Sequence, residues 1–271
     1  MKFTRRIVYY ISSIFDLFIN IENWPILIYI FLGGSKLGEY IIKFRNQKIK
    51  FYVRGAMDVW SVKETFINEF YTLYGVPIIS GWTIVDIGAG IGDFSIYVSE
   101  QQPETIIYAF EPFPSSYDLL NRNLLLNGIN NVISSKEAVW FCDTELVLDF
   151  SKGEPLQVGS LERKNAKDFH NTVPVKAISL KSLINKQNIK SINLLKLDCE
   201  GAEYDILMKA PSEILLKVER IIMEYHDLDS DHHHSQLEKF LKSEGFWVRL
   251  FKNYVHDHIG YLYAERIILA D

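Results

Sequence analysis

Residues 83–112, TIVDIGAGIGDFSIYVSEQQPETIIYAFEP, decide the fold predicted for this chain. An apolar run containing Asp86 leads into a glycine-rich turn, a helix-like segment and a second apolar run that ends in Glu111. The turn contains Gly88, Gly90 and Gly92. Glycines after a strand let the backbone turn tightly and approach a ligand without a Cβ in the way. The stretch therefore predicts a β-α-β unit with a ligand site at the carboxyl ends of its strands.

The same alternation of apolar runs and helix-like segments continues through residues 81–271, which are the expected core of the protein. Strands are expected at 84–85, 106–110, 132–133, 192–198, 220–226, 247–251 and 260–267, and helices at 93–99, 115–128 and 235–245. An added hairpin is expected from 146–150 and 173–178, joined by a polar segment. Alternating strands and helices indicate an α/β fold with a doubly wound, mostly parallel sheet.

Residues 1–35 form a separate, strongly apolar N-terminal segment that begins with basic residues. Polar residues such as Asp16 and Glu22 interrupt it, whereas a membrane span needs about 20 mostly apolar residues. No small-residue cleavage site follows the apolar part. We expect a packed pair of helices here. The alternative is an interfacial helix that rests on a membrane, with Arg5 and Arg6 facing lipid headgroups.

Residues 36–80 link this segment to the core. The pattern predicts two strands around a turn near Asn46, followed by one helix over 61–75 with apolar residues at helical spacing. Gly75 and Pro77 end that helix.

Composition limits the partners and the compartment. The chain has 271 residues, a formal net charge of −5 and no run of Lys or Arg, so we expect no nucleic-acid partner. Its two cysteines, Cys142 and Cys199, lie far apart and form neither a disulfide framework nor a zinc-ligand pattern. A reducing, cytoplasmic location fits this cysteine content best, with membrane association as the alternative introduced by residues 1–35.

The glycine turn does not fit a dinucleotide site. In G-x-G-x-x-G the third glycine would fall at Asp93 or at Ser95, depending on which glycine starts the motif. Asp86 and Asp93 would also repel a pyrophosphate. The spacing D-x-G-x-G-x-G with Glu111 after the next strand is similar instead to the S-adenosylmethionine site of class I methyltransferases. A carboxylate at Glu111 could accept hydrogen bonds from both ribose hydroxyls of that cofactor.

A second motif, INLLKLDCEGAEYDIL at residues 192–207, places Asp198 at the end of a nearly all-apolar strand. Glu200 and Glu203 follow within five residues. Three clustered carboxylates repel one another unless something offsets the repulsion. A helix N-terminus could account for Glu203, but it does not account for Asp198.

Six segments together resemble the FkbM family of S-adenosylmethionine-dependent methyltransferases. They are VDIGAGIGDFS, AFEPFP, KEAV, ISLKSLI, LLKLDCEGAEYDIL and IIMEYH. The resemblance runs from about Arg54 to the C-terminus and implies a Rossmann-like class I methyltransferase core with an antiparallel C-terminal strand. Cys199 is a mild departure from the family pattern.

The resemblance implies which residues contact the cofactor S-adenosylmethionine. Asp86, Gly88, Gly90, Gly92 and Glu111 are the expected contacts around the glycine turn, and Phe113 could lie against the adenine. Glu137 and Ala138 match the position that meets the adenine edge. Asp198 matches the acid near the reacting centre and the cofactor's amino group.

A neutral hydroxyl is a poor nucleophile, so a base near the methyl acceptor is expected. The candidates are Asp198, Glu200, Glu224 and His226. We favour His226 or Asp198 as the base and Glu224 as a positioning residue, because Glu224 and His226 lie on the same face of one strand. A structural role for His226, or a metal held by Asp198, Glu224 and His226, are the alternatives; a site without metal is the expectation.

Three consecutive histidines, His232 to His234, suggest a second metal site. Consecutive residues rarely bind one ion together in a regular element, so we interpret this segment as a solvated loop before a helix.

The expected function is methylation of a hydroxyl on a sugar, glycolipid or secondary metabolite. Residues 1–80 and 151–173 are expected to choose this small-molecule, glycan or lipid acceptor. A nicotinamide oxidoreductase would have the same type of fold but fails on glycine spacing. A non-catalytic cofactor-binding protein or membrane-associated scaffold is the other alternative. The sequence specifies no oligomeric state.

Overall fold

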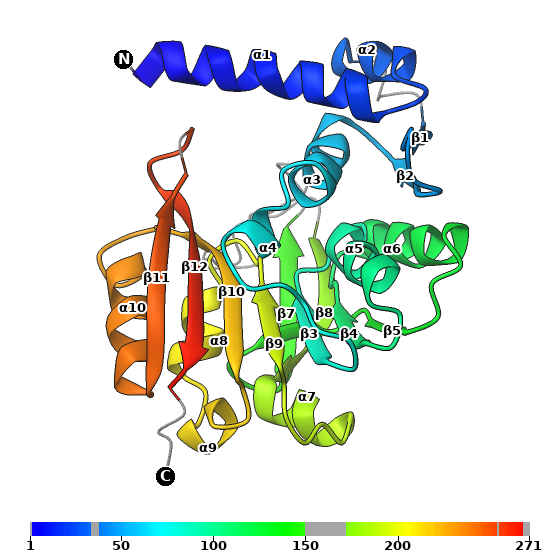
Figure 1. Cartoon of the computed structure of the whole chain (residues 1–271). Helices are drawn as coiled ribbons and strands as arrows, with labels where there is room; N and C mark the ends of the chain where they lie inside the picture. Colours follow the sequence, from blue (N-terminus) through cyan, green and yellow to red (C-terminus); the bar gives the residue numbers. More distant parts are fainter. Residues whose placement is uncertain (1, 34–37, 150–171, 254, 268–271) are drawn as a thin grey trace.

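A computed structural model of the chain describes residues 2–33, 38–149, 172–253 and 255–267, with the side chains of all of these except 2–8 and 149. Its centre is a seven-stranded sheet in the order β11-β12-β10-β9-β3-β4-β5 (Figure 1). The strands are β3 (Thr83–Ile87), β4 (Ile106–Phe110), β5 (Val132–Ser135), β9 (Leu194–Leu197), β10 (Arg220–His226), β11 (Phe246–Lys252) and β12 (Ile259–Arg266).

The pairing confirms the doubly wound sheet. The five strands from β10 to β5 pair in parallel, and the last strand, β12, runs antiparallel between β10 and β11. From β3 the chain first builds outward through β4 and β5, then returns to build the other half from β9. The strand order thus reverses between β3 and β9, which is where ligands bind in open sheets of this kind.

Helices cover both faces of the sheet because strand side chains alternate between the two faces. Ile84 belongs to the core under α5 (Asp93–Gln101) and α6 (Pro114–Leu126), whereas Val85 and Ile87 belong to the core on the opposite face. The helices of this second face are α7 (Leu180–Lys186), α8 (Glu203–Met208), α9 (Ser212–Leu215) and α10 (His234–Ser243).

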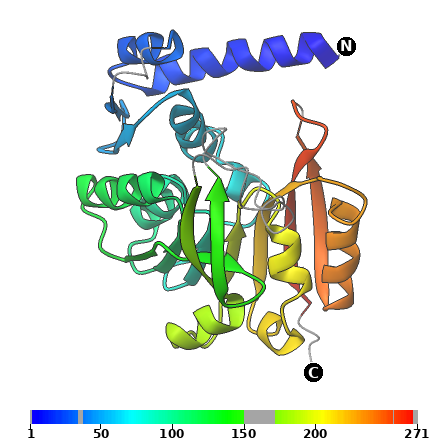
Figure 2. The same cartoon turned by 180° about the vertical axis from the view of Figure 1, so that it is seen from behind.

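A small second sheet with the order β6-β8-β7 contributes to the core with Val85 and Ile87 (Figure 2). The expected hairpin is confirmed, because β7 (Thr144–Asp149) pairs antiparallel with β8 (Thr172–Ser179). Strand β6 (Ala138–Trp140), which the sequence did not suggest, pairs in parallel with β8. The polar segment that joins the hairpin lies outside the described residues.

The expected hairpin before the core is also present, as β1 (Tyr40–Lys43) and β2 (Lys50–Val53). The single helix expected over 61–75 is wrong. Instead, α3 (Ala56–Phe66) ends early and α4 (Phe70–Leu73) follows. The carbonyl of Lys63 accepts hydrogen bonds from the backbone N–H groups of both Ile67 and Asn68, and the Lys63 ammonium donates to the Asn68 side chain. Glu69 then takes a left-handed φ of 52°, which breaks the helix.

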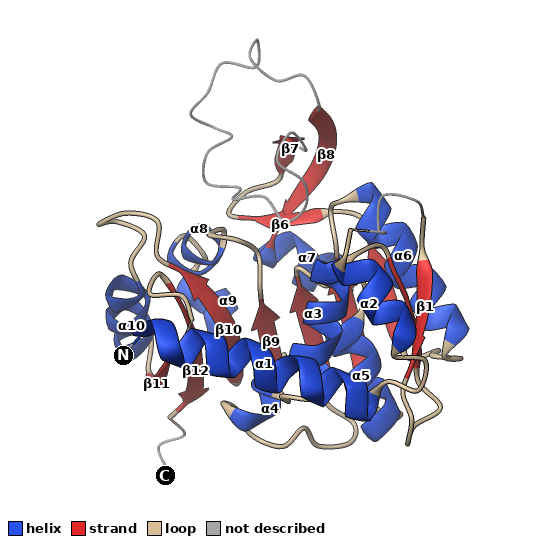
Figure 3. Cartoon of the chain, turned by 90° about the horizontal axis from the view of Figure 1, so that it is seen from above, coloured by secondary structure: helices blue, strands red, loops and turns tan. Residues whose placement is uncertain are grey.

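Residues 2–31 contain two helices, α1 (Lys2–Asn20) and α2 (Pro25–Phe31). In Figure 1 they lie at the top of the molecule, with α3 between them and the sheet, and in Figure 3 α1 crosses over the ends of the strands. Leu17, Leu27 and Ile30 anchor them, because these side chains are buried in the same core cluster as residues of α3, α5 and α6. Among the described residues, no helix has both the length and the hydropathy required to cross a membrane.

Candidate active site

The glycine turn and the acidic motif meet at the switch point of the sheet. Gly88, Gly90 and Gly92 all have positive φ values, between 53° and 87°. A Cβ on Gly88 would lie 1.8 Å from the backbone carbonyl oxygen of Asp198. This approach is possible only for glycine, so the β3 turn and the residue that follows β9 form one continuous wall.

Asp86 lies buried beneath this wall rather than in the cavity above it. Its carboxylate accepts a hydrogen bond from the Ser95 hydroxyl at 2.8 Å and lies 3.0 Å from the Lys196 ammonium. Lys196 also donates to the carbonyl oxygen of Gly88 at 2.8 Å. Burial lowers the pKa of Lys196, but the carboxylates of Asp86, Asp198 and Asp93 more than offset this, so its pKa is raised and it remains a cation. Asp86 thus positions the turn through Lys196.

Glu111, directly after β4, is 4% exposed and is fixed by backbone donors on both sides. One carboxylate oxygen accepts from Gly90 N–H at 2.8 Å, and the other accepts from Phe113 N–H at 2.9 Å. Each oxygen keeps further acceptor capacity. The carboxylate therefore has a preset orientation at the rim of the turn.

These groups border a cavity of about 870 Å³. Nine of the predicted site residues line it: Gly88, Gly90, Glu111, Phe113, Ala138, Asp198, Glu200, Glu224 and His226. Asp86, Gly92 and Glu137 do not. Gly92 precedes α5 and packs beside Leu120. Burial raises the pKa of Glu137, but hydrogen bonds from Lys186, Lys176 and Ser135 outweigh this and lower it; the carboxylate faces those lysines.

The far side of the cavity holds a cluster of carboxylates whose pKa values are raised. Burial, together with the charge of Asp198, raises the pKa of Glu64 to about 7. Burial raises the pKa of Glu200 to about 7 as well; the charge of His226 opposes this rise, and the charges of Asp198 and Glu203 add to it. Burial and the nearby charges of Asp198 and Glu64 hold the pKa of Glu224 well above its ordinary value. Such values are typical of groups that exchange protons near neutral pH.

His226 lies among these acids as a cation. Burial lowers its pKa, but the hydrogen bond and charge of Glu203, followed by the charges of Glu200 and Glu224, raise it to about 10. Its Nε2 lies 3.5 Å from Glu200. Asp198, Glu200 and His226 have potential ligand atoms within 4.8 Å of one another. In the imidazolium form, however, both ring nitrogens carry hydrogen, and the ring donates hydrogen bonds instead of coordinating an ion.

Sequence reasoning missed several residues of the site. Tyr71 donates a hydrogen bond to Asp198 at 3.0 Å and lines the cavity with Glu64 and Asp93. Both Tyr71 and Glu64 come from the segment before the core, where no spacing pointed to them. Lys196 did leave a signal, because a lysine inside an otherwise apolar strand requires a buried partner.

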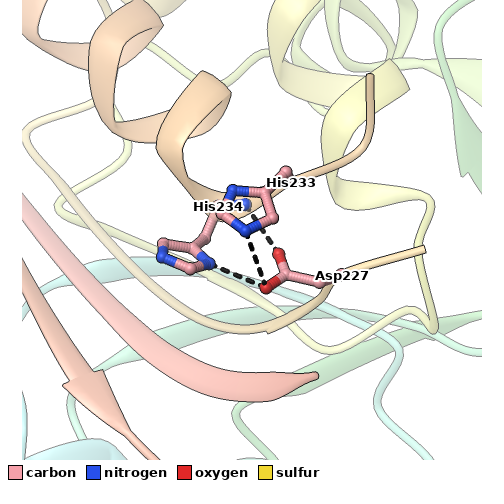
Figure 4. A group of neighbouring side chains, drawn as sticks. All are labelled: Asp227, His233 and His234. Atoms are coloured by element: carbon pink, nitrogen blue, oxygen red, sulfur yellow. Dashed lines mark hydrogen bonds and ion pairs between the residues drawn. The ribbon is translucent and has the colours of Figure 1, made fainter. Parts of the chain in front are cut away.

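The histidine-rich segment forms a compact cluster at the start of α10 (Figure 4). Asp227 accepts hydrogen bonds from the His234 backbone N–H at 2.6 Å, from the Tyr204 hydroxyl at 3.1 Å, and pairs with His234 Nδ1 at 2.7 Å. His233 lies beside His234, with ring centroids 4.1 Å apart, and its Nδ1 accepts from Ser235 N–H as the helix cap. Asp227, His233 and His234 also have potential metal-ligand atoms within 4.8 Å of one another. Its hydrogen bonds account for the position of each of the three side chains at the helix start.

Comparisons with known proteins show the family to which the chain is similar. Residues 86–248, more than half of the chain, match the sequence profile of the methyltransferase FkbM domain. The chain is 30% identical over 203 residues to Methyltransferase 1 of Beauveria bassiana, which covers 69% of this chain and 80% of that protein. It is 22% identical over 211 residues to the 31-O-demethyl-FK506 methyltransferase FkbM of Streptomyces tacrolimicus, with 69% and 80% covered. The solved structure of methyltransferase FkbM from Methylobacillus flagellatus KT aligns with a TM-score of 0.48 at 13% identity, over 76% of this chain and 53% of that one.

The fold and the family match define a class I, S-adenosylmethionine-dependent methyltransferase. The chain belongs to the FkbM methyltransferase family. The expected fold class, enzyme class and cofactor are thereby confirmed. The residues also suit the cofactor: at Gly90 a Cβ would meet no atom within 4 Å, so the space above the turn is open, and the surrounding carboxylates suit a sulfonium cation.

Proposed function

We propose that this enzyme transfers a methyl group to a hydroxyl oxygen of a sugar, glycolipid or secondary metabolite. The observation that carries the proposal is Glu200, a carboxylate with a pKa of about 7 that lines the same cavity as the glycine turn and Glu111. A base of that pKa can accept the proton of a hydroxyl near neutral pH. The name of the Streptomyces relative, 31-O-demethyl-FK506 methyltransferase, describes methylation at an oxygen of that relative's own substrate and points the same way.

The chain's own residues divide the work of holding the cofactor. Glu111 would accept from the ribose hydroxyls, and the Gly88 and Gly90 backbone would lie under the methionine part. Phe113 and Ala138 would border the adenine. Asp198, held by Tyr71, would meet the amino group. We assign Asp86 and Gly92 positioning roles, because neither residue lines the cavity. Glu137 also lies outside the cavity lining and pairs with Lys176 and Lys186 instead.

When bound, S-adenosylmethionine supplies an electrophilic methyl group on a positively charged sulfur. Alignment of the acceptor and exclusion of water are the main tasks of the protein. A carboxylate oxygen of Glu200 accepts the hydroxyl proton. His226 donates hydrogen bonds as an imidazolium and keeps part of the acid cluster ionised, so we infer that it is a positioning residue and not the base favoured from the sequence. Asp198 and Glu224 complete the acidic lining of the cavity.

The test is the chemical identity of the product. The enzyme is incubated with S-adenosylmethionine carrying an isotopically labelled methyl group and with cell extracts, and the labelled product is examined by mass spectrometry and NMR. We expect the label in a methyl ether. Label on nitrogen or carbon would contradict hydroxyl methylation, while an inactive protein that still binds S-adenosylhomocysteine would support the non-catalytic alternative.

A further inference from the structure

Helix α1 exposes apolar side chains where a surface helix normally exposes polar ones. Ile11, Phe15 and Ile19 follow one another at intervals of four residues and are 51%, 62% and 65% exposed. Ser13 and Leu17, which lie between them in sequence, are buried against the protein. A water-facing helix has the opposite polarity, so the outward face of α1 is suited to an apolar environment.

Helix α2 extends the same surface. Ile28 and Tyr29 are 43% and 44% exposed, and Leu32, directly after the helix, is 83% exposed. The two helices lie together at one end of the molecule (Figures 1 and 3). We call this surface the apolar roof: Ile11, Phe15 and Ile19 of α1 with Ile28, Tyr29 and Leu32 of α2. Exposed apolar side chains gathered on two neighbouring helices in this way mark an interaction site.

The apolar roof is continuous with the active-site cavity. Ile28 and Leu32 belong to both, and the next stripe of α1, consisting of Tyr10, Ile14 and Phe18, lines the cavity as well. The same cavity contains Glu200 and Asp198. Apolar side chains therefore lead from the exposed surface to the acids at the carboxyl end of the sheet.

The residues around the roof favour a lipid surface over a second copy of the chain. Trp24, Tyr10 and Tyr29 combine an apolar ring with a polar tip and are each 38–44% exposed, as is typical at the boundary between lipid and water. The sequence of α1 begins with three basic residues, Lys2, Arg5 and Arg6, and its first turn has no acid. Basic residues in the sequence of an amphipathic helix attract anionic lipid headgroups.

We propose that the apolar roof rests in the headgroup region of a lipid bilayer, and that the methyl acceptor is an amphiphile of that bilayer. Its hydroxyl-bearing head enters the cavity while its apolar chain stays against α1 and α2. The acceptor part of this proposal rests on the proposed function, whereas the bilayer contact stands without it.

The bilayer contact is tested by flotation of the full chain with phosphatidylcholine vesicles, with and without phosphatidylglycerol. The variant is Phe15→Asp/Ile19→Asp, whose two positions do not line the cavity. The matched control is Leu216→Asp, because Leu216 is 66% exposed and follows α9, at the opposite end of the molecule from α1 (Figure 1). Binding of S-adenosylhomocysteine by all three proteins verifies their fold.

We expect the wild type and the control to float, more strongly with the anionic lipid, and the double variant to bind at least about tenfold more weakly. Equal flotation of all three proteins, or of none, overturns the proposal. A dimer in sedimentation that the double variant dissolves, without flotation of the wild type, also overturns it in favour of a second copy.

The acceptor is tested by supplying labelled S-adenosylmethionine with vesicles made from a membrane lipid extract, and separately with an aqueous metabolite extract. We expect label in the lipid phase, reduced about tenfold or more by the double variant but not by Leu216→Asp. Label only in the aqueous extract overturns the amphiphile and leaves hydroxyl methylation standing. Label in neither extract, with cofactor binding intact, overturns both.

Discussion

The imidazole Nδ1 of His226 lies 3.3 Å from a carboxylate oxygen of Glu203, which is fully buried. Glu203 also accepts backbone hydrogen bonds from Cys199 at 3.0 Å and Gly201 at 2.8 Å. Burial lowers the pKa of His226, but the hydrogen bond and charge of Glu203, followed by the charges of Glu200 and Glu224, raise it to about 10. A protonated imidazole cannot accept a proton, so His226 does not fit the role of the base. Under the proposed function, a nearby acid accepts the proton instead.

Methyl transfer should accordingly depend on the ionisation of Glu200. Because the base must be deprotonated, we expect kcat to fall as the pH drops below about 7, the pKa of Glu200. Glu200→Gln should lower kcat by roughly a hundredfold or more and abolish this dependence. The measurement is a pH–rate profile from pH 5 to 9.

Glu64→Gln is the matched control for that profile. Glu64 lines the same cavity and also has a pKa of about 7, so its removal tests whether any acid of that pKa would serve. The low-pH limb should persist in Glu64→Gln. If the low-pH limb disappears in Glu64→Gln and persists in Glu200→Gln, Glu64 is the base.

His226 should stabilise the fold in a pH-dependent way. Its pKa is raised from 6.5 to about 10, so its contribution is fully present below pH 6.5 and is lost as the pH rises through 10. Denaturant unfolding should show His226→Gln less stable than the wild type by roughly a few kcal/mol at pH 6.5. The difference in free energy of unfolding between the two proteins should become smaller as the pH approaches 10. A gap independent of pH would mean that packing, not charge, explains the loss.

Glu111→Gln should weaken binding of S-adenosylhomocysteine. A glutamine has only one acceptor oxygen, so it leaves either Gly90 N–H or Phe113 N–H without its present acceptor and offers less to the ribose hydroxyls. We expect a loss of about 1.5–3 kcal/mol, or roughly ten- to a hundredfold in Kd, by calorimetry. Glu137→Gln, at the end of the neighbouring strand but outside the cavity, should leave Kd unchanged. An equal loss of S-adenosylhomocysteine affinity in the two variants would mean that the Glu137 side chain contacts the cofactor.

Lys196→Met should destabilise the protein by about 3–5 kcal/mol, because it leaves Asp86 buried without its ion-pair partner. The double change Lys196→Met/Asp86→Asn should cost less than the sum of the two single changes. A double-mutant cycle in denaturant measures this coupling. Additive losses would show that the two side chains act independently, contrary to their 3.0 Å contact.

Gly88→Ala should cost more stability than Gly81→Ala. Both glycines have a positive φ, at 75° and 79°, so each substitution carries a backbone cost of about 1–2 kcal/mol. At Gly81 a Cβ meets no atom within 4 Å, whereas at Gly88 it meets the Asp198 carbonyl. Gly88→Ala should therefore lose about 1–3 kcal/mol more in thermal or denaturant unfolding. Equal losses of stability in the two variants would mean that the backbone around Gly88 and Asp198 can move apart to accommodate the added Cβ.

The sheet could be predicted from the sequence because its signals are local. Buried parallel strands appear as short apolar runs, and the predicted and observed bounds of β4 and β10 coincide at 106–110 and 220–226. The break between α3 and α4 could not be predicted, because the apolar residues continue at helical spacing through it. The interruption depends on the contacts of Lys63 with Asn68 and on the backbone of Glu69.

In the active site, the sequence located the residues at the carboxyl ends of the strands, but it did not give the orientation of every side chain. Asp86 was expected to face the cofactor, but strand parity directs it with Lys196 toward Ser95. His226 was favoured as a base, together with Asp198, from its place on one strand face with Glu224. Burial lowers its pKa, but the convergence of Glu203, Glu200 and Glu224 around it raises the pKa to about 10, so that it is a cation at neutral pH. Such shifts arise from distances between elements, which spacing along the chain does not encode.

The cavity draws its walls from nearly the whole length of the chain, from Tyr10 in α1 to Ile259 at the start of β12. The lining thus joins α1, near one end of the described residues, to β12, near the other. A substitution in either element therefore changes the wall of the same chamber, although the two elements lie more than 200 residues apart in the sequence.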